Sequence, residues 1–309
     1  MESSKRNNII LTGLIVITLG VVGTLVPVVR AQFETAGQSL EVSPPSQELK
    51  DVVPGSTITI RSKIRNRSVN SLPITVRIED FVASGEEGQV ALTDKGPWAV
   101  STWTSLTPKS FELKPGETRE VAATVKVPST GVAGGRYGSF VFGVERTSDA
   151  PGTAAVSQEV ASLFLLQIKG VIEEKLSVTS FSAPAFLEFG PVPFNVTFKN
   201  DGNVHVKPGG VIAVSDMFGR KVSDVVVTPT NVFPQASRIV KPLWESTLLF
   251  GQYTATAIIY PMGDKGQPVT MNTKFIVFPV RIAAVLVFVG LILYMSRKRL
   301  GKAMKALFG

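Results

Sequence analysis

The sequence predicts an all-β fold of two tandem Ig-like β-sandwiches, placed between an N-terminal signal segment and one C-terminal transmembrane helix. Three observations support this prediction. Apolar residues alternate with polar ones through the middle of the chain, Pro-Gly turn signals precede alternating runs, and a nearly continuous apolar run lies close to the C-terminus. Alternation with a period of two is typical of strands that bury one face.

The first predicted sandwich spans residues 38–172. Ile58, Ile60 and Ile64 alternate with polar residues, and a turn at Pro54–Gly55 precedes them. Proline presets the backbone of such a turn, and glycine tolerates the positive φ of the next position. Pro115–Gly116 precedes a second alternating run in the same way. Short strands at this spacing predict a sandwich.

A stretch of small and polar residues, Thr147–Ala155, interrupts the pattern near the end of this sandwich. It predicts either a linker between domains or the tip of a long hairpin. We favour the hairpin, because the apolar run Val160–Ile172 suits a returning strand that is buried on both faces. The junction between the sandwiches then falls at residues 173–175.

The second predicted sandwich spans residues 176–277. Phe194, Val196 and Phe198 alternate with polar residues, and turn signals follow at Asn200–Asn203 and Asp216–Gly219. We expect about seven short strands in each sandwich, and each unit is large enough to bury a core of its own.

The apolar run near the C-terminus predicts a transmembrane helix at residues 278–295. About 20 residues at a rise of 1.5 Å cross a bilayer core of roughly 30 Å. Arg281 lies near one end of the run, where its side chain can reach the membrane surface. Arg297, Lys298 and Arg299 follow the run and predict a stop-transfer signal on the cytoplasmic side.

Residues 296–309 are therefore predicted to be a basic cytoplasmic tail. Their pattern suits either a short amphipathic helix on the inner leaflet or a charged tail without fixed structure.

The N-terminal segment, residues 1–31, has the pattern of a signal peptide. Lys5 and Arg6 precede an apolar stretch, and Val29 and Ala31 are suited to a cleavage site. The alternative is an uncleaved signal anchor, because the apolar stretch is long. Both alternatives place the middle of the chain outside the cytoplasm. We predict a single-pass plasma-membrane protein whose bulk is extracellular and which has the lipid bilayer as a partner.

Net charge and cysteine content exclude several classes of function. The net charge is +8, but the C-terminal tail contributes +5 and the N-terminal segment +2, so the sandwiches are nearly neutral and no nucleic-acid partner is expected. The chain has no cysteine. Disulfides, thiol catalysis and cysteine-ligated zinc are therefore excluded, and the composition suits a bacterial exported protein.

The sequence predicts no catalytic residue, metal site or cofactor. His205 is the only histidine, and its position after a turn predicts a solvated strand residue. Histidine-based triads and histidine-rich zinc sites are therefore excluded. Glu79–Asp80 and Glu86–Glu87 are the nearest candidates for a paired acid and base, but we interpret them as solvated charges. We expect a protein that is not an enzyme.

Three aromatic residues are candidate ligand contacts. Carbohydrate sites use exposed aromatic faces, and Trp98, which follows Gly96–Pro97, is the best candidate. The alternative for Trp98 and for Trp103 is a place in the core. Tyr137 follows two glycines, where a tyrosine-corner hydrogen bond would pin a sandwich, so a structural role is favoured for it.

Two groups of residues resemble the WxL-interacting surface protein family. In the first sandwich these are Trp103, Phe111–Thr118, Val125–Pro128 and Gly134–Gly138, and in the second they are Asn200–Gly210 and Asp216–Gly219. The order of signal peptide, two Ig-like units, membrane helix and basic tail is similar as well. The resemblance implies that the first sandwich binds peptidoglycan and that the second binds a partner protein or a host ligand.

We therefore expect a membrane-anchored cell-surface protein that acts in adhesion and binds peptidoglycan, another cell-surface protein, or both. The alternative is an accessory or chaperone-like subunit of a membrane secretion, pilus or transport assembly. An exported hydrolase is a third and more distant alternative.

Overall fold

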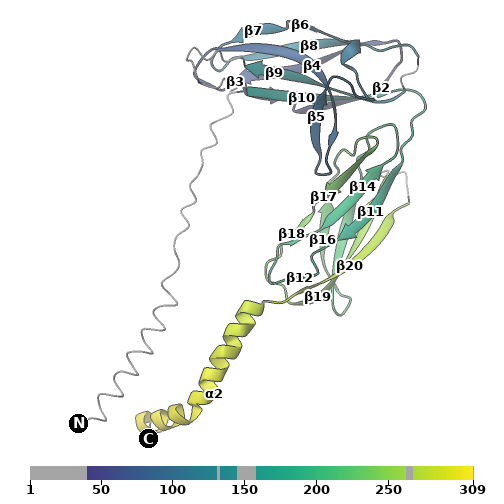
Figure 1. The fold of residues 1–309 in the computed structure, drawn as a ribbon. Coiled ribbons are helices and arrows are strands. Elements are labelled where there is room, and N and C mark those ends of the chain that lie inside the picture. The colour runs from purple at the N-terminus through teal and green to yellow at the C-terminus, as the bar shows by residue number, and fades with distance from the viewer. Residues whose placement is uncertain (1–39, 131–132, 145–157, 262–266, 309) are drawn as a thin grey trace. The chain divides into compact units, whose positions relative to one another are not determined.

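The computed structural model describes residues 40–130, 133–144, 158–261 and 267–308, with side chains up to residue 297 (Figure 1). These residues belong to one compact unit, Leu40–Gly309. The strands of this unit fall into two sets, and no strand pair among the described residues joins one set to the other. The predicted signal segment, residues 1–31, lies outside the described residues, and so does Thr147–Ala155.

The first sandwich has two sheets. One sheet has the order β1-β3-β8-β6, with β1 (Leu40–Ser43), β3 (Thr57–Asn66), β8 (Thr118–Lys126) and β6 (Thr104–Thr107). The other has the order β2-β10-β9-β4-β5, with β2 (Ser46–Val52), β10 (Gln158–Ile168), β9 (Gly134–Val144), β4 (Leu72–Ser84) and β5 (Gln89–Thr93); β7 (Ser110–Leu113) also pairs with β4. A short 3-10 helix, η1 (Ser101–Trp103), lies between β5 and β6.

Alternation places one face of each strand in the core of this sandwich. Ile60 and Ile64 of β3 are buried as predicted, and they pack in the same cluster as Phe140, Phe142 and Phe164 of the facing sheet. Strands β9 and β10 pair antiparallel along their full length, which is the pairing expected of a hairpin. Both Pro-Gly turns have glycine at positive φ, +79° at Gly55 and +73° at Gly116, as the turn type requires.

The second sandwich is built in the same way. One sheet has the order β11-β14-β17, with β11 (Leu176–Ser182), β14 (Asn195–Asn200) and β17 (Ala236–Val240). The other has the order β12-β20-β19-β15-β16, with β12 (Phe186–Leu187), β20 (Val269–Val277), β19 (Gly251–Tyr260), β15 (Gly209–Asp216) and β16 (Lys221–Val227). A two-stranded sheet pairs β13 (Val192–Pro193) with β18 (Leu243–Trp244). Phe194, Phe198 and Phe275 are buried in the core of the second sandwich.

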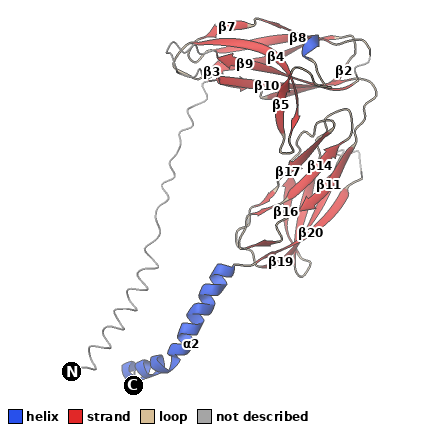
Figure 2. Ribbon diagram, viewed as in Figure 1, coloured by secondary structure: helices blue, strands red, loops and turns tan. Residues whose placement is uncertain are grey.

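A single helix, α2 (Val280–Phe308), follows β20 (Figure 2). Its first part, Val280–Arg297, is long and apolar enough to cross a membrane, and none of these residues is buried. The helix begins two residues later than predicted, because Phe278 and Pro279 connect it to β20. It also continues through the predicted tail instead of ending at residue 295.

Of the predicted anchor residues, Arg281 contacts Glu188 (3.4 Å) and Arg297 lies over the Tyr294 ring. The side chains of Lys298 and Arg299 lie outside the described part.

The predicted all-β fold class with one C-terminal apolar helix is confirmed. The exact domain boundaries, 38–172 and 176–277, stay predictions, although the two sets of strands fall within them.

Candidate functional site

Aromatic residues from both sandwiches meet in a small cluster that we call the seam: Phe81, Tyr137, His205 and Phe233. Phe81 lies near the end of β4 and Tyr137 near the start of β9, whereas His205 and Phe233 come from loops of the second sandwich. The Phe233 ring packs edge-on against Tyr137 (centroids 5.0 Å apart) and against Phe81 (5.4 Å). Edge-to-face pairs of this kind are favoured by the aromatic quadrupole.

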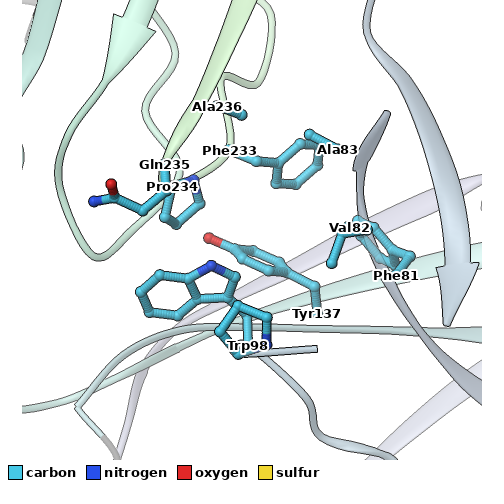
Figure 3. Close-up of a pocket in the computed structure, with 10 residues that line it drawn as sticks. Phe81, Val82, Ala83, Trp98, Tyr137, Phe233, Pro234, Gln235 and Ala236 are labelled. Atoms are coloured by element: carbon cyan, nitrogen blue, oxygen red, sulfur yellow. The ribbon is translucent and has the colours of Figure 1, made fainter. Parts of the chain in front are cut away.

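A pocket of about 170 Å³ opens beside the seam (Figure 3). Trp98 and Tyr137 line it from the first sandwich, and Phe233, Pro234 and Gln235 line it from the second. Its wall is largely apolar, so it suits a single apolar side chain or a similarly small group.

The Tyr137 hydroxyl joins the two sandwiches by hydrogen bonds. It accepts the backbone N–H of His205 (2.9 Å) and lies 3.2 Å from Nδ1 of the same residue. We predicted a tyrosine corner within one sandwich, but the hydroxyl has its partners in the other. A neutral imidazole that carries its proton on Nε2 satisfies both contacts, because Nδ1 then accepts the hydroxyl proton.

His205 is buried, with 6 % of its surface exposed, so the prediction of a solvated residue is wrong. Its Nε2 atom lies 3.1 Å from Oε1 of Glu48 on β2, but it makes no well-aligned hydrogen bond. With the neutral imidazole this is a polar contact between the Nε2–H and the carboxylate, and it becomes an ion pair when the imidazole is protonated. Lys207 pairs with the same carboxylate from the other side. The sequence could not reveal this cluster, because Glu48 lies more than 150 positions away from the two residues that it faces.

The charges of this cluster shift two pKa values. Burial alone would raise the pKa of the Glu48 carboxyl, but the hydrogen bond from Lys207 and the charge of His205 outweigh burial and lower that pKa to about 2. Burial lowers the pKa of His205, and the attraction of Glu48 opposes this only in part. Burial also raises the pKa of Tyr137, which therefore stays neutral throughout the acidic range.

We expect acid to weaken the seam in two steps. His205 has a lower pKa in the folded state than its usual 6.5, so its contribution to stability is present above pH 6.5 and is lost as the pH falls through the folded pKa. Glu48 contributes above pH 4.5, and its contribution is lost as the pH falls towards 2. The positive charges of Lys50 and Lys207 disfavour the protonated imidazole.

Denaturant unfolding measured at pH 7.5, 6.5 and 5.5 tests the first step. The unfolding midpoint of the wild type should fall between pH 6.5 and 5.5, whereas the midpoint of His205→Gln should change less over the same interval. Equal slopes for the two proteins would show that another group titrates.

Two glycines allow the sandwiches to approach each other here. A Cβ on Gly134, whose φ is +102°, would lie 2.7 Å from the Asn203 carbonyl oxygen. The neighbouring Gly135 donates its N–H to that oxygen (2.8 Å), and a Cβ there would lie 2.1 Å from the Tyr137 hydroxyl oxygen. A side chain at Gly134 would therefore push the second sandwich away, and one at Gly135 would displace the Tyr137 hydroxyl that bonds to His205.

Trp98 and Trp103, two of the predicted ligand contacts, flank one cation. The Arg136 guanidinium lies 5.3 Å from the Trp103 ring and 6.0 Å from the Trp98 ring. Both rings are partly buried, and Tyr137 is fully buried. Their role as ligand contacts stays a prediction, but Arg136 lies over one face of each indole, where a sugar would otherwise stack.

Asp80 fixes the loop that carries both tryptophans. Its Oδ1 atom accepts the N–H groups of Val100 (2.7 Å) and Ser101 (2.8 Å), and its Oδ2 atom accepts the Ser101 hydroxyl (2.6 Å). Asp80 has only 1 % of its surface exposed, so interpreting it as a solvated charge was wrong. Among the described residues, no group of three or more histidine, aspartate and glutamate side chains could hold a metal ion.

A second candidate site is an open half-edge on β10. Strand β9 pairs with the whole of β10 on one side, but β2 pairs with it on the other side only from Leu163 onward. The Leu163 N–H donates to Pro45 on that side (2.9 Å). Because backbone direction alternates along a strand, Glu159 and Ala161 also present their N–H and C=O groups to that side. No described strand pairs with them there.

Comparison with known proteins identifies no family. No family model and no curated protein matches the chain. Its fold is similar to solved pilus chaperones. The class 5 fimbriae chaperone CfaA matches at 14% identity with a TM-score of 0.40, covering 76% of this chain and 98% of its own. The CsuC-CsuE chaperone-tip adhesion subunit complex of Acinetobacter baumannii matches at 9% identity with a TM-score of 0.36, covering 75% and 97%. These scores are too low to assign a function.

Proposed function

We propose that this chain is a membrane-anchored accessory protein, not an enzyme, that holds an extended segment of another exported protein against the open half-edge of β10. Helix α2 anchors it, and the sandwiches lie outside the cytoplasm. This function is closer to the accessory or chaperone-like alternative than to adhesion through peptidoglycan. Peptidoglycan binding stays a prediction from the family resemblance, and no described feature favours it.

The open half-edge of β10 is the observation that carries this proposal. An unpaired row of backbone N–H and C=O groups is a template for another strand. Here the unpaired groups lie on the same side of β10 with which β2 pairs from Leu163 onward. An incoming segment would therefore extend the pairing along the rest of that side. Strands β5 and β16 also end their sheets, but the half-edge of β10 differs from them because β2 already pairs along the rest of the same side.

The template is rigid, which favours binding. All eleven residues of β10 pair with β9, and Val160 packs against the core of the first sandwich. Arg77 of β4 makes two hydrogen bonds to the Glu159 carboxylate (3.0 and 2.9 Å). An incoming strand therefore does not have to order its binding site, which reduces the entropic cost of association.

Proline at Ala161 should weaken binding strongly. Proline removes the outward N–H and places a ring on the edge, whereas the hydrogen bonds to β9 come from the neighbouring residues. We expect Ala161→Pro to weaken binding of a strand-forming peptide at least about tenfold, which corresponds to about 1.4 kcal/mol. Ala161→Val keeps the N–H and serves as the matched control.

The probe is a library of 12-residue peptides with alternating apolar residues. Its binding to the full chain in nanodiscs is measured, and binding of purified peptidoglycan sacculi is measured in parallel. Hydrogen exchange should show slower exchange of the Glu159 and Ala161 amides when a peptide binds. Peptide binding that survives Ala161→Pro, or binding to sacculi alone, would contradict the proposal.

A further inference from the structure

The end of the second sandwich from which α2 leaves exposes an unusual number of large apolar side chains. Phe218 has 75% of its surface exposed and Leu248 has 89%. Isolated exposed apolar residues are ordinary, but a group of them indicates an interaction site. We call the group the apolar rim: Phe186, Phe189, Met217, Phe218, Leu248, Phe250 and Phe278.

Strand pairing brings the members of the apolar rim to one end. Gly251 pairs with Val277, the last residue of β20, so Phe250 and Phe278 lie side by side with ring centroids 5.4 Å apart. The Met217 sulfur lies 3.6 Å from the position that a Cβ of Gly251 would occupy. Phe186 pairs with Ile276 in the adjacent strand.

The connection to α2 is very short. Only Phe278 and Pro279 separate β20 from the helix, and two residues span at most about 7 Å. The Val280 N–H donates back to the Phe278 carbonyl (2.8 Å), which tightens the connection further. If α2 enters the bilayer at its first turn, the apolar rim is held at the depth of the lipid headgroups.

The composition of the apolar rim suits that depth. Aromatic residues are enriched at membrane interfaces, where an apolar ring can face the acyl chains. Ion pairs stand beside the apolar residues: Arg220 lies over the Phe218 ring (5.4 Å) and pairs with Asp216 (2.7 Å), and Arg281 pairs with Glu188 (3.4 Å). Such polar groups suit the hydrated headgroup layer beside the acyl chains.

We propose that the apolar rim inserts into the headgroup region of the membrane that α2 crosses and docks the second sandwich on the bilayer surface. The occupant is lipid, because the two-residue connection brings this end of the sandwich to the bilayer whatever protein is bound elsewhere. The apolar residues are then covered without a protein partner.

The chain has no cysteine, so single cysteines can be labelled in the full-length protein. Phe218→Cys and Leu248→Cys carry an uncharged, environment-sensitive fluorophore, in nanodiscs that contain lipids with nitroxide-labelled headgroups. Val171→Cys is the matched control, because it has the same exposed fraction as Phe218, 75%, and lies at the opposite end of the second sandwich, where its carbonyl accepts a hydrogen bond from Asn203 (2.9 Å). Val289→Cys, within α2, reports on insertion of the helix.

We expect blue-shifted emission and severalfold stronger nitroxide quenching at positions 218 and 248 than at position 171, with one protein per disc. Position 289 should be quenched by a lipid that carries its nitroxide deep in the acyl chain. Labels at 218 and 248 that behave like the label at 171 would overturn the proposal, and so would an unquenched label at 289. Shielding that appears only with two proteins per disc would assign the apolar rim to a second copy and overturn it as well.

Discussion

Phe198→Ala should lower the free energy of unfolding of the second sandwich by about 3–5 kcal/mol and leave that of the first nearly unchanged. Phe198 is fully buried within the core of the second sandwich, so removing its ring leaves a cavity there. Phe142→Ala is the counterpart in the first core, where Phe142 is equally buried. We expect each variant to shift a different unfolding transition.

The measurement is calorimetry or denaturant unfolding of the full chain in detergent. Tryptophans in each sandwich serve as the probes of denaturant unfolding. Trp98 and Trp103 report on the first sandwich, and Trp244, which is buried in the second core, reports on the other. Replacement of an exposed valine of the first sandwich, Val69→Ala, controls for the effect of substitution itself. One shared transition that moves equally in both core variants would mean that the seam couples the sandwiches into a single folding unit.

Asp80→Ala should lower the free energy of unfolding by about 3 kcal/mol, although it removes only one small side chain. It leaves the buried N–H of Val100 and the partly buried N–H of Ser101 without their acceptor, and hydrogen bonds to a charged group are among the stronger ones. The loop that carries Trp98 and Trp103 should loosen, and Trp98 should move away from the pocket. Thermal unfolding gives the stability, and the emission maximum of the tryptophans follows the loop.

Asp94→Ala is the matched control for Asp80→Ala, because Asp94 is an exposed carboxylate in the same region, and its loss should stay within about 0.5 kcal/mol. Asp80→Asn should fall between the two, since its amide keeps one acceptor oxygen but lacks the charge. Equal stability of Asp80→Ala and Asp94→Ala would show that the loop is held by its apolar contacts alone.

Local patterns predicted most of the fold. The alternation around Ile60 and around Phe198 identified strands because burial on one face of a sheet repeats every second residue. The positive φ of the glycines in the two Pro-Gly turns was predicted correctly, because the conformation of a tight turn depends on residues that are adjacent in the sequence. The helix was identified by length and hydropathy, but its continuation to Phe308 was not, since basic residues are compatible with a helix and with an irregular tail alike.

The candidate sites were much less accessible to sequence reasoning. Asp80 and His205 resemble solvated residues in the sequence, because the groups that bury them come from distant segments. The open half-edge of β10 depends on where β2 stops pairing with it, and the alternation of apolar and polar residues does not show where one strand stops pairing with another. Near the seam the sequence did single out Trp98 and Tyr137, but it interpreted Tyr137 as a tyrosine corner within one sandwich. The glycine pair before Tyr137 also fits a close approach of another backbone.

The two-residue connection between β20 and α2 also has a mechanical consequence. Tension applied between the first sandwich and α2 would enter the second sandwich near Leu176 and leave through Val277, at opposite ends of its strands. The β19–β20 ladder, which runs from Gly251–Val277 to Ile259–Val269, then lies along the line of force. Its hydrogen bonds are strained together instead of opening one after another, so the second sandwich should resist tension well at the point where it is tethered.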